Sequence, residues 1–207
     1  MHPTDPQSNL WTHTATPGPE CPSLQGEHKA DVAVVGGGFT GLSAALHLAE
    51  GGAKTVLLEA GPPGFGASGR NNGQVIPVYS KHNPDDAVAI FGPEQGERLN
   101  DMVAGSADLV FDLIRKHEID CDAVQNGWLQ PAHRASRMRG VQKKHDQWAA
   151  RGAPVEIFDA DEAAELTGSP IYHGGWMHRA GGHIQPLSYC RGLARAAQEA
   201  GAAVHGD

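Results

Sequence analysis

The chain has 207 residues, 40% of them hydrophobic, which is enough for one domain or at most two with a buried core. Its 16 lysines and arginines against 24 aspartates and glutamates give a formal net charge of -8, so binding to a nucleic acid backbone is disfavoured. No positively charged segment followed by an apolar run opens the sequence, and no stretch approaches the roughly 20 apolar residues of a membrane span. We therefore expect neither nucleic acid nor membrane as a partner.

The three cysteines, Cys21, Cys121 and Cys190, are odd in number, lie far apart and include no C-x-x-C pair. This spacing predicts neither a disulfide framework nor a thiolate zinc site, and it favours a reducing, cytoplasmic compartment. The 27 glycines are about twice the average share and cluster at a few positions, where we expect the function to lie.

Residues 1–29 hold five of the 14 prolines and show little apolar periodicity, which predicts an extended arm. Residues 31–35 are a short apolar, β-branched run before a glycine triplet, as in a buried strand of a parallel sheet. After Gly41, apolar residues recur at helical spacing as far as Gly51, and a second strand is expected over 55–58. These elements form a βαβ unit.

The rest of the chain predicts a mixture of helices and strands. We expect a glycine-rich loop over 62–74, a short helix after Pro84, and paired strands over 120–132 around the turn dipeptide Asn126-Gly127. A long helix is expected within 93–117, with an apolar face that contains Leu99, Met102, Val103, Val110, Leu113 and Ile114. A basic amphipathic helix over 135–151 faces solvent or a partner, and strands over 155–158 and 171–178 flank a short helix that Asp159 or Asp161 caps. Gly181-Gly182 interrupts the second strand, and a last helix over 186–200 precedes one more strand at 203–205.

This order of elements predicts an α/β fold: a Rossmann-like nucleotide-binding layer, interrupted by a mixed α+β region, with a sheet that is incomplete at the C-terminus. We divide the chain into the arm over 1–29, the βαβ unit with its second glycine-rich loop over 30–80, a mixed region over 81–170 that forms part of the substrate region, and a return to the first layer over 171–207.

The segment from Gly36 to Gly41 satisfies G-x-G-x-x-G between a strand and a helix. In this pattern Gly36 makes the turn, Gly38 lets the backbone approach a pyrophosphate, and Gly41 allows close packing of helix on strand, while the helix directs its free N–H groups at the phosphates. Glu59, 23 residues after Gly36, ends the next strand and can accept from ribose hydroxyls. Its charge disfavours a 2′-phosphate, so NADP is the least expected dinucleotide.

A second polar, glycine-rich loop follows the acid directly, over 64–74. A nicotinamide-binding chain would usually continue into its next helix, whereas here Ser68 and Asn71 offer hydrogen bonds and Arg70 can neutralise pyrophosphate charge. Ser68 lacks the strand-to-helix elbow and the G-x-S-x-G pattern of a hydrolase nucleophile, so hydrolysis is disfavoured.

The run ADVAVVGGGFTGLSAALHLAEGGAKTVLLEA followed by GFGASGRNNGQV resembles the FAD-dependent oxidoreductases of the D-amino-acid oxidase-like (DAO) family, and within it the gamma-glutamylputrescine oxidase-like members. The resemblance extends to Leu10-Trp11 in the arm and to GGHIQPLSYCRGLARAAQEAG at 181–201, and it implies a Rossmann-like FAD-binding domain.

This resemblance implies FAD held with the glycine turn at its pyrophosphate, Glu59 at the adenosine ribose, and the second loop near phosphates and flavin. The implied cofactor-binding residues are Gly36, Gly38, Phe39, Thr40, Gly41, Glu59, Ala60, Ser68, Arg70, Asn71 and Gln74. His183 is expected as a flavin-proximal or structural residue. Noncovalent FAD is the expectation, because His47, Cys121 and Cys190 match no known attachment position.

Two departures from the family pattern stand out. Where such proteins usually read GRNGG, this chain has Asn72 in place of the first of the paired glycines; asparagine tolerates positive φ best among non-glycine residues, so we expect the loop to keep its path at a modest strain. Members of the family are also roughly twice as long, so this chain resembles their first half. We expect a fragment of a longer protein, or a chain that needs another to close its sheet.

No other cluster of residues predicts a competing site. His173, His178 and His183 are spaced by five and do not converge as metal ligands on a strand or a helix, so no metal is expected. The acidic residues Asp159, Asp161, Glu162 and Glu165 are expected to cap and solvate a short helix.

We therefore expect a flavoenzyme whose complete form oxidises the C–N bond of a small amine or amino acid with oxygen as electron acceptor, giving an imine or aldehyde and hydrogen peroxide. No catalytic residue can be assigned, and the substrate and the oligomeric state are not encoded in the sequence. Two alternatives remain open: a non-catalytic fragment or subunit of a split flavoprotein, and an NAD-dependent reductase.

Overall fold

The computed structural model describes residues 9–206 and divides them into two compact units. The first unit contains the residues up to Gly73, Leu113–Ala123 and the residues from Ile184 onward, and the second contains Gln74–Asp112 and Val124–His183. The domain limits given above stay a prediction. Within the described part of the chain, no helix has the length and apolar character that crossing a bilayer requires.

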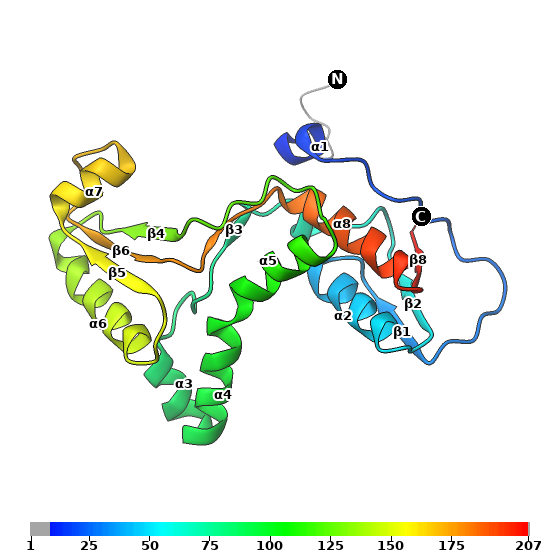
Figure 1. Cartoon of the computed structure of the whole chain (residues 1–207), viewed down its shortest axis with the longest axis horizontal. Coiled ribbons are helices and arrows are strands. Elements are labelled where there is room, and N and C mark those ends of the chain that lie inside the picture. The colour runs from blue at the N-terminus through cyan, green and yellow to red at the C-terminus, as the bar shows by residue number, and fades with distance from the viewer. Residues whose placement is uncertain (1–8, 207) are drawn as a thin grey trace. The chain divides into compact units, whose positions relative to one another are not determined.

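The first unit is built on a parallel sheet of three strands in the order β1-β2-β8 (Figure 1). β1 is Val32–Val35, β2 is Thr55–Leu58 and β8 is Ala203–His205. Leu57 in the central strand pairs with Val34 on one side and with Val204 on the other. The predicted βαβ unit and the last strand are thereby confirmed.

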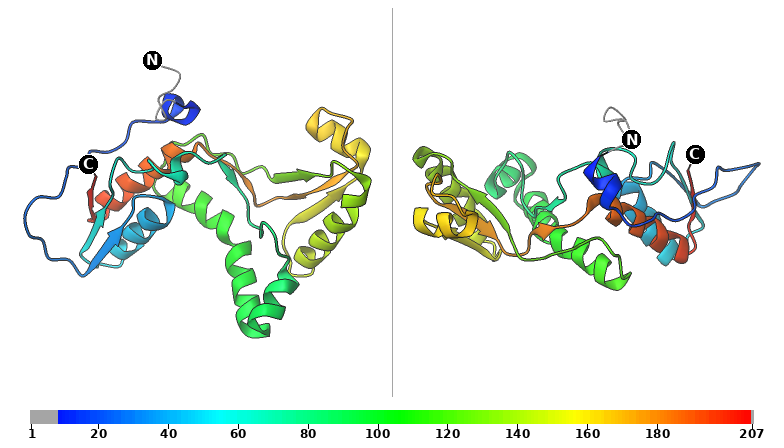
Figure 2. Two further views of the ribbon diagram at one scale, coloured as in Figure 1. Left: turned by 180° about the vertical axis from the view of Figure 1, so that it is seen from behind. Right: turned by 90° about the horizontal axis from the view of Figure 1, so that it is seen from above.

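Two helices, α2 (Phe39–Glu50) and α8 (Pro186–Glu199), pack against each other and against the strands of this sheet (Figures 1 and 2). Burial of each leucine side chain contributes about 1.5–3 kcal/mol, so this contact is a large part of the core. It fixes the N-terminus of α2 at the carboxyl end of β1. The fully buried residues of the two helices include Leu42, Ala45, Leu46, Leu193, Ala194 and Ala197.

The N-terminal arm lies along α8 and is bound through its backbone. Asn9 accepts from the N–H groups of Trp11 and Thr12 and caps a short helix, α1 (Leu10–Thr14), so the prediction of a wholly extended arm is wrong there. Residues 1–8 of the predicted arm lie outside the described residues. The donors are the side chain of Gln185, the N-cap of α8, and three side chains along α8, and the acceptors are arm carbonyls: Gln185 to Trp11 at 2.8 Å, Arg191 to Thr16 at 2.7 Å, Arg195 to Pro17 at 3.0 Å and Gln198 to Glu20 at 2.8 Å.

The second unit contains an antiparallel sheet in the order β4-β6-β5, with β4 at Trp128–Pro131, β6 at Gly175–His178 and β5 at Val155–Phe158. A 3-10 turn, η2 (Ala135–Arg137), leads into α6 (Met138–Ala149), which packs on β5 and β6 and matches the predicted basic helix. Asp159 caps α7 (Ala160–Thr167), as expected. A further pair, β3 (Gln74–Val75) with β7 (Gly182–His183), was not predicted.

The helices over residues 84–116 differ from the prediction in one place. The helix expected after Pro84 is α3 (Pro84–Phe91), but the long helix within 93–117 is two helices, α4 (Pro93–Ala104) and α5 (Ser106–Lys116). Gly105 ends α4, and the helical periodicity does not continue across it. Consequently Met102, expected on the apolar face, is 73% exposed, whereas Leu113 and Ile114 are buried.

The hairpin expected over 120–132 is also wrong. β4 pairs with β6, and Val124 forms an isolated bridge to His183. Gly127 has a φ of 105°, which residues with a Cβ rarely adopt, and a Cβ there would also lie 2.7 Å from the sulphur of Met177 on β6. β6 covers only the last four residues of the strand expected over 171–178, and the glycine pair after it leads into β7. A turn dipeptide is a local pattern and does not identify which distant strand becomes the partner.

Candidate functional site

The glycine turn joins the end of β1 to the start of α2. Gly36 has a φ of 107°, a conformation that residues with a Cβ rarely adopt, and its N–H donates to the carbonyl of Leu58 at 2.8 Å. A Cβ on Gly41 would lie 1.9 Å from the carbonyl oxygen of Gly36, so only glycine fits there. These two glycines bring the first turn of α2 directly against the end of the strand, as the sequence predicted.

Backbone donors without a protein acceptor gather at this end of α2. Gly38 is the N-cap and has no side chain to cap the helix. Within residues 9–206, the N–H groups of Gly38, Thr40 and Gly41 donate to no protein acceptor. Together with the positive end of the helix dipole, they suit an anionic group with several acceptor oxygens, such as a pyrophosphate.

Glu59 follows β2 and faces the same turn. One carboxylate oxygen accepts from the N–H of Gly37 in a short hydrogen bond, and the other accepts from the N–H of Ala60 at 2.9 Å. Each oxygen keeps a further lone pair, so the carboxylate can still accept from a hydroxyl. Backbone N–H groups thus hold both oxygens of the Glu59 carboxylate in place.

The second loop is bound to the glycine turn by two contacts. The N–H of Gly64 donates to the carbonyl of Gly37 at 2.9 Å, and the hydroxyl of Ser68, in the 3-10 turn η1 (Ala67–Gly69), accepts from the N–H of Phe39 at 3.1 Å. A Cβ on Gly38 would lie 2.8 Å from the Ser68 hydroxyl oxygen. Ser68 therefore lies beside the donors at the start of α2.

The side chains of Arg70 and Asn71 differ in how many of their polar atoms form hydrogen bonds within the loop. The Asn71 amide donates to the carbonyl of Ser68 at 2.7 Å and accepts from the N–H of Gly73 at 2.8 Å, so it organises the loop itself. The exposed guanidinium of Arg70 lies over the ring of Phe65 at 5.5 Å and donates from Nε to the carbonyl of Gly66 at 3.2 Å. Its two terminal nitrogens remain available for an anion.

Asn72 is not the strained position that the sequence suggested. Among the non-glycine residues of the described chain, positive φ occurs at Glu118 and Asp122, and in this loop it is Gly64 and Gly73 that have it, with φ values of 81° and 72°. A Cβ on Gly73 would lie 2.3 Å from the carbonyl oxygen of Ile184. The loop therefore keeps its path without the strain expected at Asn72.

Two residues implied by the resemblance belong to the second unit. Gln74, in β3, accepts from the indole N–H of Trp128 at 3.2 Å. His183 exchanges two backbone hydrogen bonds with Val124, both at 2.9 Å, and its side chain is exposed. The other predicted cofactor residues all lie in the first unit.

Sequence reasoning missed the support that α8 gives to the second loop. Leu187 and Cys190 lie under Gly64, where a Cβ would come within 2.8 Å and 2.9 Å of their side chains. Burial raises the pKa of the Cys190 thiol to about 12, so this cysteine acts as a packing residue. The spacing of Leu187, Cys190 and Ala194 along one helix face is the pattern that indicates this contact.

Metal binding finds no support in the part of the chain that the structure covers, where no group of three or more His, Cys, Asp or Glu side chains converges. His178 is buried while His173 and His183 are exposed. Of the four acidic residues expected to cap and solvate a helix, Asp159 and Glu162 form the capping box of α7, and Asp161 and Glu165 are exposed.

A profile of the family described as "FAD dependent oxidoreductase", DAO, matches residues 31–207. The chain belongs to this family. It is 37% identical over 176 residues to gamma-glutamylputrescine oxidoreductase of Escherichia coli, covering 84% of this chain and 41% of that protein. It is 36% identical over 202 residues to the probable oxidoreductase OrdL of Rhizobium meliloti, covering 97% and 47%.

Among solved structures, the L-amino acid deaminase of Proteus myxofaciens superposes with a TM-score of 0.76 at 19% sequence identity, over 93% of this chain and 41% of that one. At this identity the likeness shows the fold alone, and it confirms the α/β FAD-binding architecture. The chain spans less than half the length of these relatives.

Members of the DAO family bind FAD. The donors at the start of α2, the fixed Glu59 carboxylate and the available nitrogens of Arg70 fit the phosphates and a ribose of such a dinucleotide. Noncovalent binding stays a prediction.

Proposed function

We propose that this chain forms the FAD-binding part of an amine or amino-acid oxidase. The observation that carries the proposal is the set of free N–H groups at the start of α2, enclosed by Glu59 on one side and Ser68 on the other. The family membership and the two relatives named above support the reaction class.

In this proposal each residue has a role that its geometry allows. The N–H groups of Gly38, Thr40 and Gly41 bind the pyrophosphate, and Arg70 adds a positive charge beside it. Glu59 accepts from the adenosine ribose. Phe39, Ala60 and Asn71 contribute backbone and loop contacts, whereas the cofactor contact that the resemblance implies for Gln74 stays a prediction.

Bound noncovalently, FAD would accept the two electrons that leave the C–N bond of a small amine or amino acid and pass them to oxygen, so that the products are an imine, which water converts to a carbonyl compound, and hydrogen peroxide. The chain's own contribution is to hold the dinucleotide in one position. No described residue is assigned as a catalytic acid or base. The three cysteines are free thiols, which agrees with the proposed cytoplasmic compartment.

The test is the visible absorption spectrum of the purified chain and of a version extended beyond Asp207 to the length of the relatives. We expect a flavin spectrum near one FAD per chain, released by heat, and its loss in Gly38→Val, where the added side chain fills the approach to the helix N-terminus. Gly140→Ala, at a helical glycine with open space around it, is the matched control and should keep the flavin.

An extended protein that purifies without flavin would contradict the proposal. Binding of NADH in its place would favour the reductase alternative. A colourless short chain beside a yellow extended protein would show that the short chain is a fragment without activity of its own, an alternative that the coverage of less than half of each relative favours.

A further inference from the structure

A buried glutamine at the start of α8, Gln185, joins separate segments of the first unit by hydrogen bonds. It is the N-cap of the helix and is 4% exposed. Its side-chain oxygen accepts from the N–H of Ser188 at 2.7 Å, and its side-chain nitrogen donates to the carbonyl of Trp11 at 2.8 Å and to the hydroxyl of Thr14 at 3.1 Å. Its backbone N–H donates to the carbonyl of Cys121 at 2.7 Å. One side chain therefore caps α8 and holds the arm.

The residues on either side of this glutamine contact the second loop. The N–H of Ile184 donates to the carbonyl of Gly73 at 2.9 Å, and a Cβ on Gly73 would lie 2.3 Å from the carbonyl oxygen of Ile184. A Cβ on Gly64 or on Gly69 would lie 2.8 Å or 2.9 Å from the side chain of Leu187. The end of the loop thus lies directly against the chain that enters α8.

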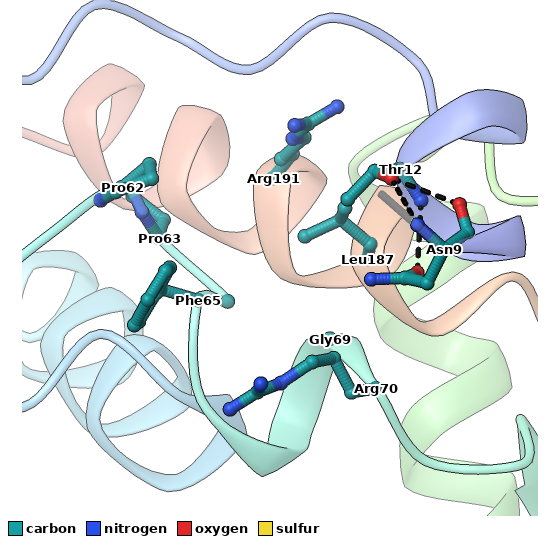
Figure 3. A pocket seen from close by; sticks show the side chains of 10 residues that line it. Asn9, Thr12, Pro62, Pro63, Phe65, Gly69, Arg70, Leu187 and Arg191 are labelled. Carbon is teal, nitrogen blue, oxygen red and sulfur yellow. Dashed lines mark hydrogen bonds between the residues drawn. The ribbon is translucent and has the colours of Figure 1, made fainter. Parts of the chain in front are cut away.

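The first turn of α8 contacts the arm as well as the loop. The hydroxyl of Ser188 accepts from the N–H of Thr16 at 3.0 Å, and Leu187 lines one cavity with Asn9 and Thr12 of the arm (Figure 3). The arm helix α1 has five residues and buries none of them. A helix of this length is not stable in water by itself, so this end of the arm depends on its contacts with α8 for its position.

We infer that Gln185 is a positioning residue of the cofactor site, through which the arm fixes the end of the second loop. Because Ile184 and Gln185 are consecutive, a shift of Gln185 moves Ile184 against Gly73, where the close contact leaves no space. The loop that ends at Gly73 carries Ser68 and Arg70, which the proposed function places at the cofactor. In this respect the inference rests on the proposed function, and it makes FAD affinity depend on a residue outside both glycine-rich segments.

Gln185→Glu separates the two roles of this side chain. A carboxylate keeps an oxygen for the N–H of Ser188 and suits a helix N-terminus, but it has no N–H for the arm. Hydrogen exchange of the purified full chain measures the result at two amides, that of Thr16 for the arm and that of Ile184 for the contact with Gly73. We expect protection at both amides to fall about ten-fold.

Gln198→Glu is the matched control, because it makes the same change to another side-chain amide of α8 that donates to an arm carbonyl, that of Glu20. Protection at Ile184 should stay within about two-fold of the natural chain. Equal losses at Ile184 in both variants would show a general effect of charge or of the arm, and would refute the inference. A loss at Thr16 without a loss at Ile184 in Gln185→Glu would overturn the link between arm and loop.

A variant in the arm tests the same link without changing α8. Thr14→Val removes one acceptor of the Gln185 amide, so protection at Ile184 should fall about three-fold. Unchanged protection at Ile184 would show that Gln185→Glu acts through α8 alone, and would contradict the role of the arm.

The pH profile of Gln185→Glu distinguishes the lost donor from a folding defect. Burial raises the pKa of a carboxyl group, and a protonated carboxyl group again has a donor for the carbonyl of Trp11. Protection at Ile184, relative to the natural chain, should therefore recover as the pH is lowered from about 7 to about 5. A deficit that stays constant or grows over this range would refute the importance of the donor.

Titration with FAD connects this residue with the proposed function. We expect the dissociation constant for FAD to rise about ten-fold in Gln185→Glu and to stay within about two-fold in Gln198→Glu. Unchanged FAD affinity in Gln185→Glu, despite lower protection at Ile184, would refute a role at the cofactor site. A chain that binds no FAD but loses protection at Ile184 in Gln185→Glu would contradict the proposed function and leave the link between arm and loop standing.

Discussion

The contact between Gly38 and Ser68 allows a quantitative test of how the second loop is held. In Gly38→Ala the new Cβ would lie 2.8 Å from the Ser68 hydroxyl oxygen, so that hydroxyl must rotate away from the N–H of Phe39. Losing this 3.1 Å hydrogen bond costs about 1 kcal/mol. Ser68→Ala removes the same bond and has the same cost. The double variant should also cost about 1 kcal/mol, about half the sum of two independent losses.

Hydrogen exchange at the Phe39 amide measures this cost locally. Each of the three variants should lower its protection about five-fold relative to the natural chain, since about 1 kcal/mol corresponds to that factor. A double variant near twenty-five-fold would mean that the two residues act independently, and would refute the contact. FAD retention adds a second readout: the Cβ of residue 38 stays near the pyrophosphate donors in the double variant, so retention should remain below that of Ser68→Ala alone.

Three further predictions concern titratable groups. Burial lowers the pKa of the His178 imidazole, whose two ring nitrogens have no hydrogen-bond partner within the described residues, so thermal stability should fall as the pH drops below about 6.5, and His178→Met should flatten this dependence. Arg151 lowers the pKa of Glu97 to about 2, so this carboxylate stabilises the fold above about pH 4.5 and loses that effect as the pH falls toward 2; in Arg151→Gln, acid unfolding should begin at higher pH. Burial raises the pKa of the Cys190 thiol to about 12, so mass spectrometry should show much slower alkylation of Cys190 than of the partly exposed Cys21, and equal rates would contradict the packing described.

The first unit could be predicted well because its pattern is local. A strand, a glycine turn and a helix follow one another within residues 31–50. The close contact that requires glycine at position 41 is with the carbonyl oxygen of Gly36, only five residues earlier. The second unit was predicted less well because its sheet pairs distant segments. β4 finds its partner in β6, more than 40 residues later, and the turn dipeptide before β4 carries no information about that choice.

The same limit applies to the contact between the arm and α8. Arg191 is, in the sequence, one polar position on an amphipathic helix. Its hydrogen bond to the carbonyl of Thr16 depends on where the arm lies, and the arm has little apolar periodicity by which to predict it. Apolar periodicity predicts buried faces, whereas a segment held through its carbonyl groups leaves no such pattern.

That mode of attachment determines how the arm tolerates change. Every residue type, proline included, has a backbone carbonyl oxygen. The hydrogen bonds from α8 to the carbonyls of Pro17 and Glu20 therefore do not depend on the side chains of these two residues. Substitutions along the arm should therefore be silent at these contacts. Inserting or deleting a single residue within the arm would instead shift the carbonyl groups that follow it away from the side chains that now donate to them. The number of residues in the arm is therefore constrained more tightly than their identity.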